Sequence, residues 1–349
     1  MKRLKQRQQR QSENRNICPA DWSRPRLRSI LRGFGGRKIL VLGDVGIDRY
    51  IMGSVERISP EAPVPIVAVE EEKYKLGLAA NVADNVHALG GVAILSGVVG
   101  RDRGGDDFRS LLQASGISPA YLITDPSRRT VLKERIVSER QQLLRVDYEN
   151  VHPIGPRVEA AFLKRVKLLA AKCDAIILED YAKGMLSRRL AEAIFSIALR
   201  ARKVVAVDPN LKTSLEMYRG ATVLTPNTRE AEMLAGFQIR DEASLLEAGH
   251  VILRATRARH IVITRGKDGM AIFSSAARAV TLIPTYAREV YDVSGAGDTV
   301  ISVLALALST GATIEEASIL GNLAAGVEVA KRGTATVSPD EIIAAMDSF

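Results

Sequence analysis

The chain has 349 residues, of which 46% are apolar and 26% charged, and its formal net charge is +9. This length suits one large α/β domain or a domain with a small appendage, and because no run of about 18 uncharged apolar residues occurs, a membrane-spanning helix is excluded. The positive charge is not a general sign of nucleic-acid binding, because residues 1–38 carry a net charge of +10 and the remainder a net charge of −1.

The two cysteines, Cys18 and Cys173, are far apart and have no metal-binding spacing. They are typical of free thiols in a reducing compartment, so we expect a cytoplasmic protein. Residues 1–23 form a basic leader rich in Gln, Arg and Asn, without an apolar period, and we expect it to be disordered. The leader is either a solvated tail or a weak site for nucleic acid or an anionic surface. Residues 24–349 are expected to form the folded domain.

The first half of this domain is expected to alternate core βα units with two β-rich excursions, at about 50–70 and 130–147. The first excursion holds three prolines between short β-like pieces, which favours an edge hairpin over a central strand. The spacing of apolar residues predicts a short helix within 22–34, a buried strand over 38–43, a helix over 77–90, a strand over 92–99, a helix over 106–114, and strands over 130–137 and 142–146.

In the second half, strands alternate regularly with helices of about 10 to 15 residues, a pattern that predicts a parallel sheet covered on both faces. The predicted helices span 158–171, 187–200, 228–235, 241–256, 296–308 and 313–330, the last two closing the chain. The predicted strands span 174–179, 203–207, 222–225 and 260–264, followed by a hairpin across 269–283.

The segment 292–298 reads Asp-Val-Ser-Gly-Ala-Gly-Asp and leads directly into an apolar helix. Its glycines allow consecutive amide N–H groups to point outward at the start of the helix, where the macrodipole adds roughly half a positive charge. This pattern favours binding of phosphate oxygens. A carboxylate beside such a site, that of Asp298, suits a base that takes a proton from an attacking hydroxyl; the alternative is an acidic residue that only complements the dipole.

Polar clusters follow several predicted strands, at 180–184, 208–210, 227–230 and 264–269. Because the carboxyl ends of parallel strands share one edge of a sheet, these clusters can converge on the same crevice as 292–298. Each also has a purely structural interpretation. Asn227 with Glu230 is a capping-box variant, 266–269 is a hairpin turn, Asp180 is a helix cap and Lys183 a solvated charge.

Several common site types are absent from the sequence. There is no G-x-x-x-x-G-K-[ST] loop, which excludes a Walker-type NTPase, and no G-x-G-x-x-G follows the first strand, which disfavours a dinucleotide fold. The four histidines are scattered, so we predict neither a metal cluster nor a catalytic triad.

Four motifs carry a resemblance to a known family: GDVGID (43–48), GLAAN (77–81), NTRE (227–230) and DVSGAGDT (292–299). On these motifs the chain resembles the ribokinase-like (PfkB) carbohydrate kinases from about Arg37 to its C-terminus. Within that family it is most similar to kinases that phosphorylate D-glycero-β-D-manno-heptose 7-phosphate at its anomeric hydroxyl. That likeness is carried by ERISPEAPVPIV (56–67), RQQLLRVDYE (140–149), DYAKG (180–184), YRGATVLTPN (218–227) and GTATVSPDE (333–341).

The resemblance implies a three-layer α/β/α fold with a mostly parallel central sheet and a small β lid. It implies dependence on ATP and Mg²⁺, and leaves open whether a monovalent cation supports 292–298. It makes Asp298 the general base and assigns the charge of the transferring phosphoryl group to the amides of Gly295, Ala296 and Gly297. Asn227 and Glu230 would organise Mg²⁺ through water, and the nucleotide side would be lined by Thr264, Gly266 and Gly269.

For the sugar, the resemblance implies hydrogen bonds from Asp48, which follows the first strand, and from Asn81, which lies with Gly77 near the start of the helix over 77–90. The β lid would contact a phosphorylated sugar. Because this lid is often a dimer interface in the family, we also expect a homodimer. The remaining expected substrate contacts are Lys133, Arg135, Gln142, Arg145, Asp180 and Lys183. The product would be a heptose 1,7-bisphosphate, a precursor of ADP-heptose for lipopolysaccharide.

One position departs from the family pattern. Leu78 follows Gly77 where relatives usually have a second glycine that lets the sugar approach the backbone closely. The departure leaves open a kinase for another sugar or nucleoside, and a binding protein that has lost turnover.

Overall fold

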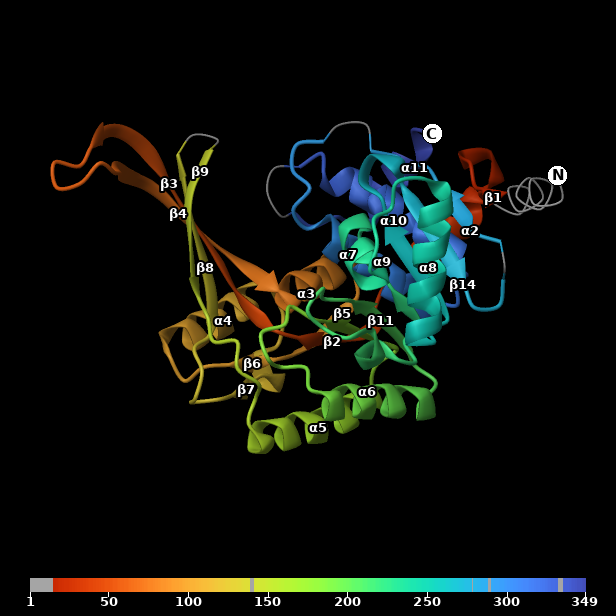
Figure 1. Ribbon diagram of the computed structural model, residues 1–349, viewed down its shortest axis with the longest axis horizontal. Coiled ribbons are helices and arrows are strands. Elements are labelled where there is room, and N and C mark those ends of the chain that lie inside the picture. The colour runs from red at the N-terminus through yellow and green to blue at the C-terminus, as the bar shows by residue number, and fades with distance from the viewer. Residues whose placement is uncertain (1–14, 139–140, 278, 288–289, 332–334) are drawn as a thin grey trace.

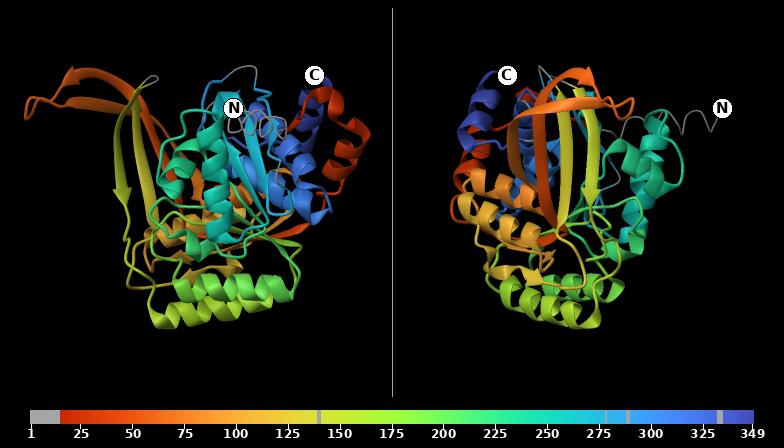
Figure 2. Two further views of the ribbon diagram at one scale, coloured as in Figure 1. Left: turned by 45° about the vertical axis from the view of Figure 1, so that its right-hand side comes forward. Right: turned by 90° about the vertical axis from the view of Figure 1, so that its left-hand side faces the viewer.

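A computed structural model describes residues 15–138, 141–277, 279–287, 290–331 and 335–349, which form an α/β body with a projecting β ribbon (Figures 1 and 2). The nine strands of the central sheet follow the order β1-β15-β14-β13-β12-β11-β10-β2-β5. Neighbouring strands from β5 to β13 pair in parallel, and β14 is antiparallel to β13 and to β15. The predicted mostly parallel sheet is therefore confirmed. Its strands are β1 (Arg15–Asn16), β2 (Lys38–Gly43), β5 (Val92–Ser96), β10 (Ala175–Glu179), β11 (Val204–Asp208), β12 (Val223–Leu224), β13 (His260–Thr264), β14 (Met270–Ser274) and β15 (Thr281–Ile283).

Two hydrophobic cores lie on opposite faces of this sheet, because successive side chains of a strand point to opposite faces. Ile39 and Val41 join one core, and Leu40 and Leu42 join the other. The first core is covered by α2, α3, α4, α9, α10 and α11, the second by α5, α6, α7 and α8. The helices are α2 (Arg24–Arg32), α3 (Ala79–Ala88), α4 (Arg103–Ala114), α5 (Pro156–Ala170), α6 (Arg188–Arg200), α7 (Thr228–Ala235), α8 (Glu242–Thr256), α9 (Ala296–Ser309), α10 (Ile314–Glu328) and α11 (Pro339–Asp347).

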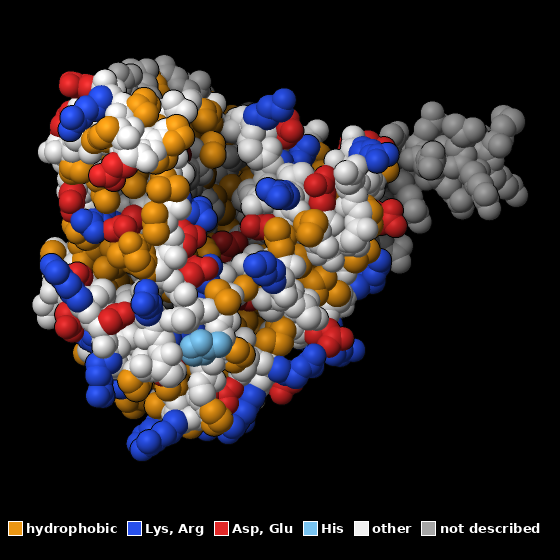
Figure 3. All heavy atoms as spheres, turned by 60° about the vertical axis from the view of Figure 1, so that its left-hand side comes forward, with side chains coloured by type: hydrophobic (Ala, Val, Ile, Leu, Met, Phe, Trp, Pro, Cys, Tyr) orange, Lys and Arg blue, Asp and Glu red, His pale blue; other side chains and the backbone are white. Residues whose placement is uncertain are grey.

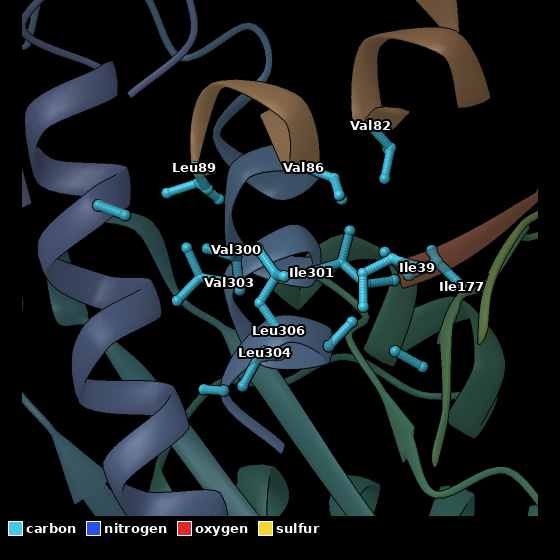
Figure 4. Packing of buried hydrophobic residues seen from close by; sticks show 14 of the residues in the cluster. Ile39, Val82, Val86, Leu89, Ile177, Val300, Ile301, Val303, Leu304 and Leu306 are labelled. Carbon is cyan, nitrogen blue, oxygen red and sulfur yellow. The ribbon is translucent and has the colours of Figure 1, made fainter. Parts of the chain in front are cut away.

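Helix α9 is buried along most of its length, from Thr299 to Ala307. It packs on β10 and β11 and between α3 and α10, and Figure 4 shows Ile301 close to Val86 of α3 and Ile39 of β2. An apolar surface all around a helix requires such burial on every side. The packing fixes the start of α9 at the edge of the sheet where the parallel strands end.

A second sheet, here called the β ribbon, has the order β4-β3-β8-β9 and projects from the body (Figures 1 and 2). The two predicted β excursions thus join in one sheet. Its first two strands are longer than the predicted short pieces, because the prolines lie in the turn or at a strand start, where no ladder hydrogen bond is lost. The strands are β3 (Val45–Ile58), β4 (Pro65–Leu78), β8 (Val131–Ser138) and β9 (Gln141–Tyr148).

The remaining elements are short. The predicted strand 92–99 is interrupted after β5 and continues as β6, which pairs with β7. These elements are η1 (Pro19–Asp21), β6 (Val98–Val99), η2 (Pro119–Tyr121), β7 (Ile123–Thr124), η3 (Leu215–Tyr218) and η4 (Gly266–Asp268). None of the helices in the described ranges has both the length and the apolarity that a bilayer crossing requires.

The N-terminal prediction needs a correction. Residues 1–14 of the predicted leader lie outside the described residues, but the expectation of disorder up to residue 23 does not hold for the part that follows. The Arg15 amide donates to the Val280 carbonyl and the Ile17 amide to the Leu282 carbonyl, both at 2.9 Å. Ile17 is buried in the first core. Residues 15–17 are held in place by one buried apolar side chain and by backbone hydrogen bonds to a distant strand. Sequence composition cannot reveal such long-range contacts.

The C-terminal prediction also needs a correction, because α11 follows the helix that was expected to close the chain. Ser338 and Glu341 form a capping box around its start, and Pro339 occupies the first turn. Ser-Pro-x-Glu before an apolar stretch is a recognisable start signal. The local sequence therefore did contain evidence for this helix.

Candidate active site

The start of α9 is formed by the glycine-rich segment. Gly295 is the N-cap residue and has a left-handed conformation, with φ of 102°. Because the first amides of a helix have no partner within it, this end carries partial positive charge. The Ala296 amide donates to the Val293 carbonyl at 3.5 Å, and Gly297 has open space where a Cβ would lie. The predicted phosphate site is thus a helix start with an unobstructed backbone at Gly297.

Asp298 lies in the first turn of α9 and is held by two side chains from distant elements. Asn81 Nδ2, on α3, donates to Asp298 Oδ2 at 2.5 Å, and the Tyr181 hydroxyl, after β10, donates to Oδ1 at 3.4 Å. Burial raises the pKa of Asp298 to about 6, although both hydrogen bonds act to lower it. A carboxylate with a pKa near the working pH can accept a proton and release it again.

Two more carboxylates lie beside this aspartate. Glu179 ends β10 and Asp208 ends β11, and one oxygen from each lies within 4.8 Å of an Asp298 oxygen and of the other. Glu179 is 1% exposed, and neither of its oxygens has a hydrogen-bond partner. Burial, followed by the neighbouring acidic groups, raises the pKa of both Glu179 and Asp208. A compact set of carboxylate oxygens of this kind suits a hard divalent cation.

On one side of Asp298 lies a pocket of about 640 Å³ that brings together all five residues predicted for the nucleotide. Asn227 Oδ1 accepts from the Glu230 amide at 3.0 Å and Glu230 Oε2 from the Asn227 amide at 2.8 Å, so the pair is also a capping box for α7. Burial raises the pKa of Glu230. The predicted residues that line the pocket are Asn227, Glu230, Thr264, Gly266 and Gly269, together with Ala296 and Gly297.

Much of the pocket lining was not predicted. It includes apolar side chains from described residues at 287, 290 and 293 and from α10, and the polar Asp208, Thr225 and Asn322. Asn322 gave a signal, since it is a polar residue within an otherwise apolar helix; its amide donates to the Pro284 carbonyl at 2.6 Å. The apolar residues that line the pocket gave no such signal in the sequence, because they come from separate elements. They are Met270, Ala287, Val290, Val293, Val300, Ala325 and Val329.

On the other side of Asp298, the base of the β ribbon carries several predicted sugar contacts. Asp48 on β3 pairs with Arg135 on β8 at 2.5 Å, and the strand register aligns Asp48 with Lys133. A Cβ at Gly77 would lie 2.7 Å from an Asp48 carboxylate oxygen, which explains the glycine. The space-filling view shows a hollow in this face with acidic side chains at its bottom (Figure 3).

The other predicted substrate residues have partners within the protein or lie farther away. Asp180 accepts from the Tyr218 hydroxyl at 2.7 Å, and Lys183 pairs with Glu149 at 2.6 Å. On β9, Arg145 lies opposite Arg135 and pairs with Asp147. Gln142 lies opposite Val137, farther along the ribbon from Asp48, and is exposed. Asn81, predicted to bind the sugar, donates a hydrogen bond to Asp298 through its amide nitrogen.

Leu78 has an unusual backbone conformation, with φ of 58° and ψ of −139°. These backbone angles are nearly restricted to glycine. They therefore explain why relatives usually have a glycine at this position, where this chain has leucine. Leu78 is 6% exposed and lies between Gly77, which touches Asp48, and the helix that carries Asn81.

The chain is similar to two curated bacterial proteins over most of its length. The "Bifunctional protein HldE" of Geobacter sulfurreducens is 41% identical over 323 residues, which is 93% of this chain and 66% of that protein. The protein of the same name from Caulobacter vibrioides is 44% identical over 324 residues, 92% of this chain and 66% of that protein. The chain thus spans about two thirds of the length of these relatives.

A solved structure of Arabidopsis thaliana ribokinase complexed with ribose and ATP superposes with a TM-score of 0.70 at 16% identity, covering 89% of this chain and 99% of that one. Phosphofructokinase-2 from Escherichia coli in complex with potassium gives 0.72 at 18% identity, covering 90% and 99%. These neighbours show a ribokinase-like fold. The pfkB carbohydrate kinase family model matches residues 37–341. The chain therefore belongs to the pfkB family and is an ATP-dependent carbohydrate kinase.

Proposed function

We propose that the chain transfers the γ-phosphoryl group of ATP to the anomeric hydroxyl of D-glycero-β-D-manno-heptose 7-phosphate. The product would be the 1,7-bisphosphate, a precursor in the ADP-heptose route to lipopolysaccharide. Two lines of support are the heptose-kinase motifs in the sequence and the relatives named HldE, identical at about 40%.

The observation that carries the proposal is a group of cations at the base of the β ribbon. Burial lowers the pKa of Lys133; Asp48 opposes this, and Lys183, Arg135 and Arg145 lower it further. Arg135, Arg145 and Lys183 each pair with a carboxylate, but Lys133 forms no ion pair within the described residues. A sugar that carries its own phosphate would supply an anion for Lys133, whereas an unphosphorylated pentose would not.

In the proposed reaction, Asp298 takes the proton of the anomeric hydroxyl, and the oxygen attacks the γ-phosphorus as the bond to the bridging oxygen of ADP breaks. The backbone at Gly295, Ala296 and Gly297 stabilises the charge on the phosphoryl oxygens. Asn227 and Glu230 would hold Mg²⁺ through water, which neutralises nucleotide charge. Positioning and charge neutralisation supply most of the catalysis in this chemistry.

The test is a kinetic comparison of acceptors with MgATP: the heptose 7-phosphate, the unphosphorylated heptose, ribose and fructose 6-phosphate. We expect the highest kcat/KM with the heptose 7-phosphate, and a new anomeric phosphate resonance in the ³¹P spectrum. A higher kcat/KM for any other acceptor rejects the heptose assignment and leaves the family unaffected. The strained Leu78 beside the sugar contacts favours a kinase for another sugar or nucleoside as the second candidate.

We also propose that two copies pair through the β ribbon. Several large apolar side chains on it are exposed by 38% to 60%, and pairing two copies would remove their apolar surface from water. They are Ile58, Val64, Val69, Leu144 and Tyr148. Light scattering should give twice the chain mass of 37.9 kDa, and Leu144→Glu should reduce it to one chain. A monomeric wild type would reject this pairing.

A further inference from the structure

The loop after β10, residues 180–184, is held by two buried aspartates. Asp180 accepts from the Tyr218 hydroxyl at 2.7 Å and from the Ala182 amide at 2.8 Å. Asp44, at the end of β2, accepts from the Lys183 amide at 3.0 Å. Asp180 and Asp44 are 6% and 5% exposed. Burying two carboxylates is costly, and here they fix the backbone of one short loop.

The same loop has a constrained backbone. Ala182 has φ of 52°, a left-handed conformation that non-glycine residues seldom adopt, and Gly184 has φ of 93°. A Cβ at Gly184 would lie 2.1 Å from the His152 carbonyl oxygen, so only glycine fits there. Strain of this kind persists only where the surroundings determine the conformation, and it gathers at functional positions.

The residue that this loop presents is Tyr181. Its hydroxyl donates to Asp298 Oδ1 at 3.4 Å, and the Lys133 ammonium lies 5.8 Å from the centre of its ring. A phenol keeps its proton at neutral pH, so the Tyr181 hydroxyl is the donor in this hydrogen bond. Tyr181 therefore stands between the aspartate on α9 and a lysine on strand β8 of the ribbon.

We propose that Tyr181 is a positioning residue for phosphoryl transfer: its hydroxyl fixes the orientation of the Asp298 carboxylate, and its ring links that orientation to the β ribbon through Lys133. The terminal torsion of an aspartate is soft, so one donor leaves the carboxylate free to turn. Asn81 holds Oδ2 and Tyr181 holds Oδ1, and together they define its plane. This inference rests on the proposed role of Asp298 as the base.

The first test is Tyr181→Phe, which keeps the ring beside Lys133 and removes only the hydroxyl. We expect kcat to fall about tenfold, the loss typical of one hydrogen bond to a charged group, while the KM for ATP stays within about twofold. Tyr121→Phe, in η2 away from the site, is the matched control and should keep the wild-type kcat. Thermal melting checks that both variants fold. A kcat for Tyr181→Phe equal to that of the control overturns the proposal.

The second test is a double-mutant cycle with Lys133→Met, which keeps the aliphatic stem and removes the charge. If Lys133 acts on Asp298 through Tyr181, Lys133→Met lowers kcat by a smaller factor in the Tyr181→Phe background than in the wild type. Equal factors overturn the link to the ribbon. The assays use whichever sugar the wild type phosphorylates fastest, so a wrong heptose assignment does not affect them. Full activity of Asp298→Asn would show separately that the base assignment has failed.

Discussion

The Asn81 amide donates a hydrogen bond of 2.5 Å to Asp298, although 217 positions separate the two residues in the chain. Asn81 lies in the first turn of α3, a helix that begins directly after the strained Leu78. Asp298 lies in the first turn of α9. Because α3 packs against α9, the two helix starts meet at the edge of the sheet. The motif that was expected to bind sugar thus also sets the electrostatic environment of the candidate base.

This contact predicts a pH effect. The bond from Asn81 stabilises the ionised carboxylate and lowers the pKa of Asp298, which burial raises to about 6 overall. The base works only when ionised, so kcat/KM should fall tenfold per pH unit below about pH 6. Asn81→Leu removes the donor, which should raise the pKa of Asp298 and move the acidic limb of the pH profile to higher pH. An acidic limb that stays in place would contradict this assignment.

Asp298→Asn should separate catalysis from binding. The amide has nearly the same shape but cannot accept the proton, so kcat should fall by about 10²–10⁴-fold. The affinity for ATP, measured by calorimetry, should not decrease, since a negative charge beside the phosphates is removed. A variant that retains most of its kcat would exclude Asp298 as the base. A wild type that binds ATP and phosphorylates none of the sugars tested would favour the alternative of a binding protein that has lost turnover.

The features that the sequence predicted well are those encoded locally. The pairing of Asn227 with Glu230, and the glycine turn before Asp298, involve residues within a few positions, and strand and helix periodicity predicted the parallel sheet. The apolar wall of the nucleotide pocket and the contact of Asn81 with Asp298 depend on how distant elements pack. Tyr181 and Asp208 were visible in polar clusters after strands, but no local pattern distinguishes them from neighbours that only fix the loops.

Glu179→Gln should stabilise the protein at high pH. Burial and the nearby acidic groups raise the pKa of Glu179 in the folded state, so its stabilising protonated form is fully present below the unfolded pKa of about 4.5 and is lost as the pH rises through the folded pKa. The glutamine does not titrate. The melting temperature of Glu179→Gln should therefore equal that of the wild type near pH 4 and exceed it near pH 8, by about 2 °C for each ~1 kcal/mol of relative stabilisation.

Glu341→Gln is the control for this experiment. Partial burial acts to raise the pKa of Glu341, but its contacts with Lys331 and Ser338 outweigh that and lower it. Its stabilising form is the ionised one, present above the unfolded pKa and lost as the pH falls. Glu341→Gln should therefore lower the melting temperature near pH 8. A difference between Glu179→Gln and the wild type that does not change with pH would contradict the raised pKa of Glu179.

At position 78, a glycine variant should be more stable than an alanine variant, the reverse of the usual order. At ordinary backbone angles glycine is less stable than alanine by about 0.5–1 kcal/mol, but φ of 58° with ψ of −139° strains any residue that has a Cβ, by about 1–3 kcal/mol. Leu78→Gly should therefore unfold at a higher urea concentration than Leu78→Ala. Leu76 is the matched control, since it is equally buried, with 5% exposure, on the same strand. There the alanine variant should be the more stable. The same order at both positions would mean that Leu78 is not strained.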